Sequence, residues 1–196
     1  MNEQKKYLRN LLVLSSPSGG GKTTVARHLM GKFPQIRFSV SATTRKPRQG
    51  EIHGRDYFFF DTGEFLDKVR KGDFVEFEEI YGNYYGTLHS EIDEAVMLNQ
   101  ILLFDVDVKG ALSLKKAYPD NTLTLFLAPP GIEELKQRLT GRQSESEEQI
   151  NKRMGRAIME MKMKNEFDFC VVNDELNKTL LAVENIFIDN VLGMEE

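Results

Sequence analysis

The chain has 196 residues, which is enough for one domain with a sizeable core and short for two. Hydrophobic residues make up 40% and charged residues 29%, close to the average of globular domains, which argues against a disordered chain or a fibrous repeat. The net charge of −4 argues against a broad surface for nucleic acid. We therefore expect a globular domain that binds no bulk nucleic acid.

The N-terminal segment and the cysteine content indicate the compartment. Met1 to Asn10 is polar, the apolar run that follows is too short for a secretory signal, and no stretch approaches membrane-spanning length. Cys170 lies in an apolar run, which indicates a buried thiol in a reducing compartment and not a disulfide or a catalytic thiol. We expect a cytoplasmic protein without membrane contact, either a monomer or a homo-oligomer.

The first structural unit predicted along the chain is a strand, a loop and a helix. Leu11 to Leu14 is a continuous apolar run, typical of a strand buried on both faces. A glycine-rich segment follows it. Val25, Leu29, Met30 and Phe33 then repeat at helical spacing until Pro34 closes the segment.

Further strands and helices alternate along the rest of the chain, which predicts an α/β fold with a parallel sheet and helices on both faces. The expected strands are Ile101 to Phe104, Leu123 to Leu127 and Phe169 to Val172, and the expected helices lie around Ala111 to Tyr118, Ile132 to Leu139 and Leu180 to Val191.

Two segments depart from this alternation. Phe38 to Leu88 is rich in aromatic residues, glycine and charge, with short alternating stretches at Asp56 to Phe60 and Phe74 to Phe77, so we expect an inserted antiparallel β subdomain there. The polar stretch after Thr140 predicts a surface flap. Ser144 and Glu147 offer a capping box that would restart a helix within it.

The glycine-rich segment Ser-Pro-Ser-Gly-Gly-Gly-Lys-Thr, residues 16–23, matches the phosphate-binding P-loop except that serine replaces the first glycine. Its glycines let successive N–H groups point into one concavity at the start of a helix. Lys22 would neutralise the β- and γ-phosphates of ATP, and the Thr23 hydroxyl would ligate Mg²⁺. A turn that merely caps a helix is the alternative, which the preceding strand and the following helix disfavour. The predicted ATP-binding residues here are Ser16, Pro17, Ser18, Gly19, Gly20, Gly21, Lys22, Thr23 and Thr24.

Asp105 and Asp107 follow the apolar run that ends at Phe104. A carboxylate at the C-terminal end of a buried strand can hold Mg²⁺ directly or through water, and we expect Asp105 to do so together with Thr23. Acidic residues also end strands for reasons of turn chemistry alone, so this signal depends on the P-loop.

Three further motifs lie between these elements: Ser-Ala-Thr-Thr-Arg-Lys-Pro-Arg-Gln-Gly-Glu at 41–51, Gly-Arg-Asp-Tyr at 54–57 and Tyr-Gly-Asn-Tyr-Tyr-Gly-Thr at 81–87. With them the sequence resembles guanylate kinases through essentially the whole chain. The resemblance implies a P-loop three-layer fold divided into a core (about residues 8–38, 98–132 and 165–196), a GMP-binding insert (about 39–97) and a helical lid (about 133–164).

The resemblance also implies an acceptor site for GMP. Arg45 and Arg48 straddle Pro47, which favours an extended loop from which two guanidinium groups could grip one phosphate. The alternative for these basic residues is a solvated loop. By resemblance, Tyr57 and Tyr85 join these arginines in binding the GMP phosphate.

Glu76 is implied as the residue that reads the base, because a carboxylate accepts from both N1–H and the exocyclic amine of guanine. The alternative is an exposed strand residue beside Glu78 and Glu79. Ser41 and Thr87 are implied to contact the base through their hydroxyls, and Asp107 to lie near GMP and the metal.

The remaining residues implied by the resemblance belong to the lid and to the adenine side of the site. Arg138, Arg142 and Arg153 would be lid arginines that stabilise the transition state, and Asn173 would lie near the adenine. Together these assignments give a catalytic set of Lys22, Arg45, Asp107, Arg138, Arg142 and Arg153.

The implied activity is Mg²⁺-dependent transfer of the ATP γ-phosphate to GMP, with dGMP as a further acceptor, in purine nucleotide metabolism. Two other functions stay open: a peptide-binding scaffold module of the same fold without catalysis, and a related kinase that phosphorylates a sugar phosphate. The intact P-loop disfavours the first alternative, and the guanine-reading Glu76 disfavours the second.

Overall fold

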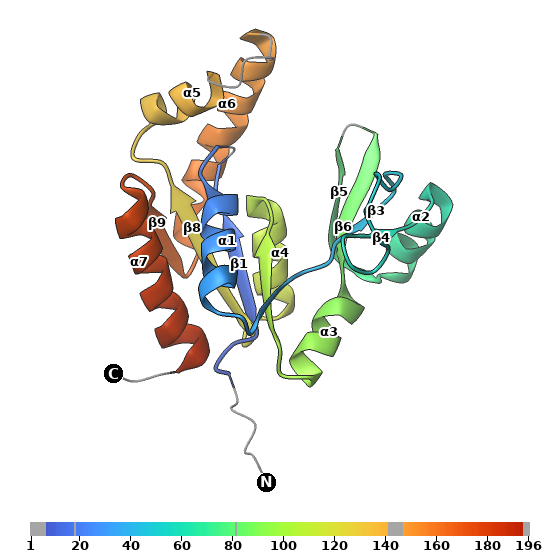
Figure 1. Ribbon diagram of the computed structural model, residues 1–196. Helices are drawn as coiled ribbons and strands as arrows, with labels where there is room; N and C mark the ends of the chain where they lie inside the picture. The colour runs from blue at the N-terminus through green and yellow to red at the C-terminus, as the bar shows by residue number, and fades with distance from the viewer. Residues whose placement is uncertain (1–6, 18, 81, 141–146, 194–196) are drawn as a thin grey trace.

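The computed structural model describes residues 7–17, 19–80, 82–140 and 147–193. Its core is a five-stranded sheet in the order β2-β7-β1-β8-β9, in which every pair of neighbours is parallel (Figure 1). The strands are β1 (Leu11–Ser15), β2 (Ile36–Phe38), β7 (Ile101–Asp105), β8 (Thr122–Ala128) and β9 (Phe169–Val172).

The apolar run at Leu11 forms the central strand, β1, which is buried along its whole length. It pairs with β7 on one side and β8 on the other, so that Leu14 lies opposite Asp105. Since the strands are parallel, their C-terminal ends meet at one edge of the sheet, and the loop after Ser15 lies beside Asp105.

Helices cover both faces of this sheet, which confirms the predicted three-layer α/β architecture. One face packs against α1 (Lys22–Lys32) and α7 (Leu176–Phe187), and the other against α3 (His89–Met97) and α4 (Val108–Ala117). The last helix begins earlier than predicted, at Leu176, and continues as a π-helical segment, Ile188–Leu192.

A second, four-stranded sheet in the order β4-β3-β6-β5 stands apart from the first (Figure 1). Its strands are β3 (Ala42–Thr43), β4 (Phe58–Phe59), β5 (Phe74–Ile80) and β6 (Asn83–Leu88). The predicted antiparallel pairing holds for β5 with β6 and for β3 with β6, whereas β3 and β4 pair in parallel. The long loop between β3 and β4 allows this, because only a tight hairpin requires antiparallel strands.

The insert also contains α2 (Thr62–Lys71), which the sequence reading did not predict. The Asp61 side chain caps it by accepting a hydrogen bond of 2.8 Å from the Glu64 N–H, and Gly72 ends it in the left-handed conformation. Phe65 is fully buried and its ring stacks on those of Phe74 and Tyr84, with centroids 4.4 and 5.5 Å away. The insert therefore has a small apolar core of its own.

The remaining helices are α5 (Ile132–Thr140) and α6 (Glu147–Lys162), followed by a short 3₁₀ segment, Lys164–Glu166. Buried Leu135 and Ala157 join α5 to α6. The predicted restart of a helix agrees with α6 beginning at Glu147, while Ser144 lies outside the described residues. No helix in the described ranges is both long and apolar enough to span a membrane.

The prediction of a buried thiol is wrong, because Cys170 is exposed. It lies in β9, the edge strand of the parallel sheet. Side chains alternate along a strand, and here Phe169 and Val171 pack against the core while Cys170 and Val172 face outward. One face of the apolar run Phe169–Val172 therefore packs on the core, and the other face is exposed.

Candidate active site

The loop between β1 and α1 exposes main-chain N–H groups at the start of a helix. Gly19 and Gly21 have φ of 86° and 91°, a left-handed conformation that favours glycine. Gly21 occupies the N-cap position of α1 and has no side chain to cap it. The helix N-terminus is thus open to an anion, as a P-loop requires.

Asn173 holds this loop in place. Its Nδ2 donates a hydrogen bond of 2.9 Å to the Gly20 carbonyl, although the two residues are far apart in sequence. A Cβ atom at Gly21 would lie 2.4 Å from the same Nδ2, so only glycine fits there. The structure therefore brings Asn173, which was expected near the adenine, against the backbone of the phosphate loop.

Lys22 and Thr23 both face Asp105 across the loop. Lys22 Nζ lies 3.3 Å from the Ser16 carbonyl and 3.7 Å from Asp105 Oδ1, and the Thr23 hydroxyl donates to Asp105 Oδ2 at 3.4 Å. A hydroxyl and a carboxylate are hard oxygen ligands, so this pair fits Mg²⁺. In the described ranges no cluster of three or more His, Cys, Asp or Glu could hold a metal, so phosphate oxygens and water would complete such a site.

These residues and the P-loop glycines line a cavity of about 360 Å³. Its lining consists of Ser16, Gly19, Gly20, Gly21, Lys22, Thr23, Thr24 and Asp105. Pro17 contributes through its carbonyl, which accepts a hydrogen bond of 2.9 Å from the Gly20 N–H. Ser18 lies outside the described residues. We call this cavity the donor pocket.

A second cavity, of about 270 Å³, lies between the parallel sheet and the insert, and we call it the acceptor cleft. The insert contributes Ser41, Tyr57 and Tyr85 to its wall, and the core contributes Asp105 and Asp107. Asp105 also lines the donor pocket. One carboxylate therefore stands at the junction of the two cavities.

Glu76 lies at the base of the acceptor cleft, and its Oε1 accepts a hydrogen bond of 2.7 Å from the hydroxyl of buried Thr87. Burial raises the pKa of Glu76, the charges of Asp107 and Glu78 raise it further, and the hydrogen bond from Thr87 opposes them. A largely buried carboxylate with one oxygen already bonded is suited to accept hydrogen bonds from a ligand.

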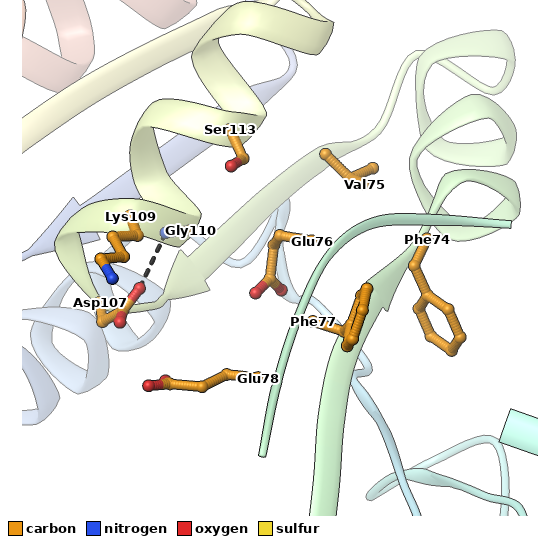
Figure 2. A pocket seen from close by; sticks show the side chains of 9 residues that line it. All are labelled: Phe74, Val75, Glu76, Phe77, Glu78, Asp107, Lys109, Gly110 and Ser113. Atoms are coloured by element: carbon orange, nitrogen blue, oxygen red, sulfur yellow. Dashed lines mark hydrogen bonds between the residues drawn. The ribbon is translucent and has the colours of Figure 1, made fainter. Parts of the chain in front are cut away.

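Beyond Glu76 the site continues into a cavity of about 420 Å³ beside α4, where Glu76, Glu78 and Asp107 all point inward (Figure 2). Asp107 caps α4: its Oδ1 accepts a hydrogen bond of 2.8 Å from the Gly110 N–H. A Cβ atom at Gly110 would lie 3.4 Å from Glu76 Oε2 and 3.3 Å from Asp107 Oδ1. A glycine at this position leaves space around both carboxylates.

Arg45 forms a two-pronged ion pair with Glu51, at 2.8 and 3.0 Å, and the Arg48 N–H donates to the same carboxylate at 2.6 Å. The hydrogen bond from Arg45 holds the pKa of Glu51 below its ordinary value. Arg45 also lies over the Tyr57 ring, 5.3 Å from its centroid. The Glu51 carboxylate thus occupies the fork of Arg45 as a phosphate would.

Sequence reasoning missed two residues of this region. Glu51 stands in the same short motif as Arg45, so the Arg-x-Pro-Arg-x-x-Glu spacing could have pointed to their pairing. Arg156 of α6 donates a hydrogen bond of 2.6 Å from Nη2 to Asp107 Oδ2, and no local sequence pattern predicts this contact.

The structure assigns only two of the three predicted lid arginines to a helix. Arg153 lies half-buried in α6, Arg138 lies in α5, and Arg142 falls outside the described residues. Of the predicted acceptor residues, the lining of the acceptor cleft includes Ser41, Tyr57, Glu76, Tyr85 and Asp107. Thr87, Asn173, Arg45 and Arg48 are not among the lining residues of either cavity, although Thr87 bonds to Glu76 and Arg45 lies over the Tyr57 ring.

Comparison with known proteins shows which family the chain resembles. The family model described as guanylate kinase matches residues 8–190. A guanylate kinase of Chlorobium luteolum is 45% identical over 196 residues, covering 100% of this chain and 99% of its own length. A guanylate kinase of Chlorobaculum tepidum is 49% identical over 173 residues, covering 88% of this chain and 89% of its own.

A solved structure is also similar. The crystal structure of guanylate kinase from Anaplasma phagocytophilum superposes with a TM-score of 0.69 at 30% identity and covers 94% of this chain and 87% of its own. The match extends over the parallel sheet, the insert and the helical segment together. The chain belongs to the guanylate kinase family.

Proposed function

We propose that this chain transfers the γ-phosphate of ATP to GMP, giving ADP and GDP, and that it also accepts dGMP. The observation that carries the proposal is that the donor pocket and the acceptor cleft meet at Asp105. A phosphate held by the P-loop and a nucleotide held by the insert would therefore face each other across one carboxylate. Such proximity is the main requirement of phosphoryl transfer.

On the donor side, the N–H groups of Gly19 and Gly21 bind phosphate oxygens and Lys22 neutralises the β- and γ-phosphates. Thr23 and Asp105 are the residues that would hold Mg²⁺. When bound, Mg²⁺ offsets the negative charge of the phosphates.

On the acceptor side, Glu76 accepts hydrogen bonds from N1–H and the exocyclic amine of guanine, and Ser41 and Thr87 contribute hydroxyls. Burial of Glu76 supports this role, because an unpaired buried carboxylate strongly disfavours a base that lacks those donors. Adenine has no such donor pair.

The GMP phosphate displaces Glu51 from Arg45 and is held there with Arg48, Tyr57 and Tyr85. The two-pronged contact of Arg45 with Glu51 supports this exchange, because the same guanidinium face fits a carboxylate and a phosphate.

The transfer is a direct in-line attack of a GMP phosphate oxygen on the γ-phosphorus, without a covalent enzyme intermediate. Arg138, Arg142 and Arg153 stabilise the charge that spreads over the transferred group, and Asp107 helps to position GMP. In this proposal the chain divides into a core, an insert and a lid, and closure of the insert and the lid over the core excludes water.

The test is an assay of ADP formation with ATP, Mg²⁺ and each nucleoside monophosphate in turn. We expect turnover with GMP and dGMP and little with AMP, CMP or UMP. Lys22→Ala should abolish the GMP-dependent rate, whereas Lys116→Ala, at an exposed lysine of α4, should keep it. Equal rates with AMP and GMP, or none with any acceptor, would refute the proposal.

A further inference from the structure

Arg156 of α6 lies in the acceptor cleft. Its Nη2 donates a hydrogen bond of 2.6 Å to Asp107 Oδ2, its Nη1 lies 3.6 Å from Glu78 Oε1, and its Nε donates to Glu160 Oε1 at 2.9 Å. The contact with Glu160 is within the helix and aims the guanidinium at the other two carboxylates.

These contacts connect three parts of the molecule. Asp107 follows β7 and caps α4 of the core, Glu78 lies in β5 of the insert, and Arg156 belongs to α6. Asp107 Oδ1 is already engaged by the Gly110 N–H, so the bond from Arg156 to Oδ2 fixes the second oxygen of the same carboxylate. The plane of the carboxylate is therefore held from both sides.

The contacts of Arg156 matter because several carboxylates line the acceptor cleft. Glu76, Glu78 and Asp107 all line it, and Arg156 is the basic residue among the described residues of its wall. Like charges at short range repel one another, and a buried or partly buried group is screened only weakly by salt. Without Arg156, Asp107 and Glu78 would tend to move apart.

We propose that Arg156 is a positioning residue for the acceptor nucleotide: it holds Asp107 and Glu78 in the arrangement around Glu76 that GMP binds. This inference rests on the proposed function, because it assigns Arg156 to the acceptor side of that reaction. Arg156 acts through Asp107 and Glu78, so its role differs from that of the lid arginines, which act on the charge of the transferred phosphate.

We expect the loss of Arg156 to raise the KM for GMP moderately and to leave the KM for ATP nearly unchanged. The Arg156 side chain is 50% exposed, and ion pairs of such residues are weakened by solvent. We expect Arg156→Ala to raise the KM for GMP about fivefold. The KM for ATP should change less than about twofold, because the described carboxylates that Arg156 contacts, Asp107, Glu78 and Glu160, do not line the donor pocket.

The experiment uses the full chain and compares Arg156→Ala, Arg156→Lys and Lys162→Ala by steady-state kinetics with GMP and ATP varied separately. Lys162 is an exposed basic residue of the same helix, so Lys162→Ala removes the same charge outside the cleft. Arg156→Lys keeps the charge and should restore part of the affinity for GMP. Calorimetric titration with GMP alone, beside thermal unfolding, separates weaker binding from weaker folding.

Equal KM values for GMP in the wild type and Arg156→Ala would overturn the inference, as would an equal rise in both KM values or the same rise in Lys162→Ala. A wild-type chain that does not phosphorylate GMP would instead refute the proposed function. A double-mutant cycle of Arg156→Ala with Glu78→Gln provides the second test, because a role through Glu78 requires non-additive changes in the KM for GMP.

Discussion

The donor pocket and the acceptor cleft are built in different ways. Among the described residues, the donor pocket is lined by Ser16 and the consecutive run 19–24, whose main-chain N–H groups we propose bind phosphate; Asp105 lines it from a distant part of the chain, and Asn173 supports the loop. The acceptor cleft is made by side chains from both sheets and from α6. A site of main-chain groups depends on loop conformation, whereas a site of side chains depends on how far separated elements pack.

The largest effect should come from a change of loop conformation on the donor side. Gly21→Ala introduces a Cβ atom 2.4 Å from Asn173 Nδ2 at a φ of 91°, so either the loop or the Asn173 side chain that holds it must shift. We expect kcat/KM for ATP to fall about a hundredfold, because small misplacements of bound phosphates are costly. Steady-state kinetics with ATP varied would measure this.

Gly31→Ala is the matched control, since Gly31 lies in the same helix and a Cβ atom there meets nothing within 4 Å. It should leave the kinetics unchanged and raise the free energy of unfolding by about 0.5–1 kcal/mol. A Gly21→Ala enzyme with normal kinetics would contradict a donor pocket made by the main chain.

The next effect should be confined to the acceptor side. Glu76→Gln keeps the shape of the side chain but removes its charge and one acceptor, so we expect the KM for GMP to rise about tenfold to a hundredfold. The KM for ATP should stay constant, because Glu76 does not line the donor pocket.

Glu79→Gln serves as the control, because Glu79 is an exposed neighbour in the same strand and should tolerate the change. If Glu79→Gln impaired GMP use and Glu76→Gln did not, the assignment of the base-reading residue would be wrong.

A smaller effect is expected on the pH dependence of kcat/KM for GMP. Since burial raises the pKa of Glu76, lowering the pH protonates it and weakens GMP binding before an ordinary glutamate would respond. Thr87→Val removes a hydrogen bond that lowers this pKa, so the acid limb of kcat/KM for GMP should move to higher pH. The corresponding profile for ATP should not move. A Thr87→Val profile that coincided with the wild type would separate Thr87 from the titration of Glu76.

The parallel core was predicted from the sequence, and the donor pocket could be proposed from it, because both depend on local features. β1 reads as a continuous apolar run and the P-loop as consecutive residues. The missed helix α2 had local signals too, namely Asp61 with Glu64 at its start, Phe65 with Val69 on one face and Gly72 at its end. The helix α2 could therefore have been predicted from the sequence.

The exposure of Cys170 and the contact between Arg156 and Asp107 could not be predicted from the sequence, and the reason is physical. Cys170 sits in an apolar run, but the order of strands puts β9 at the edge, and nothing local specifies that order. Arg156 and Asp107 are 49 residues apart, and their contact depends on how α6 packs over the sheet. Long-range packing, and not residue pattern, decides such placements.

The most direct test of the central claim, that the donor pocket and the acceptor cleft meet for direct transfer, follows the phosphoryl group itself. The enzyme is incubated with GMP and with ATP that is radiolabelled at the γ-phosphate, and the nucleotides are separated. Direct transfer predicts one labelled GDP for each ADP formed, with the label on its β-phosphate and none on the protein. Labelled inorganic phosphate released in place of GDP, or a labelled enzyme that later passes the group to GMP, would contradict it.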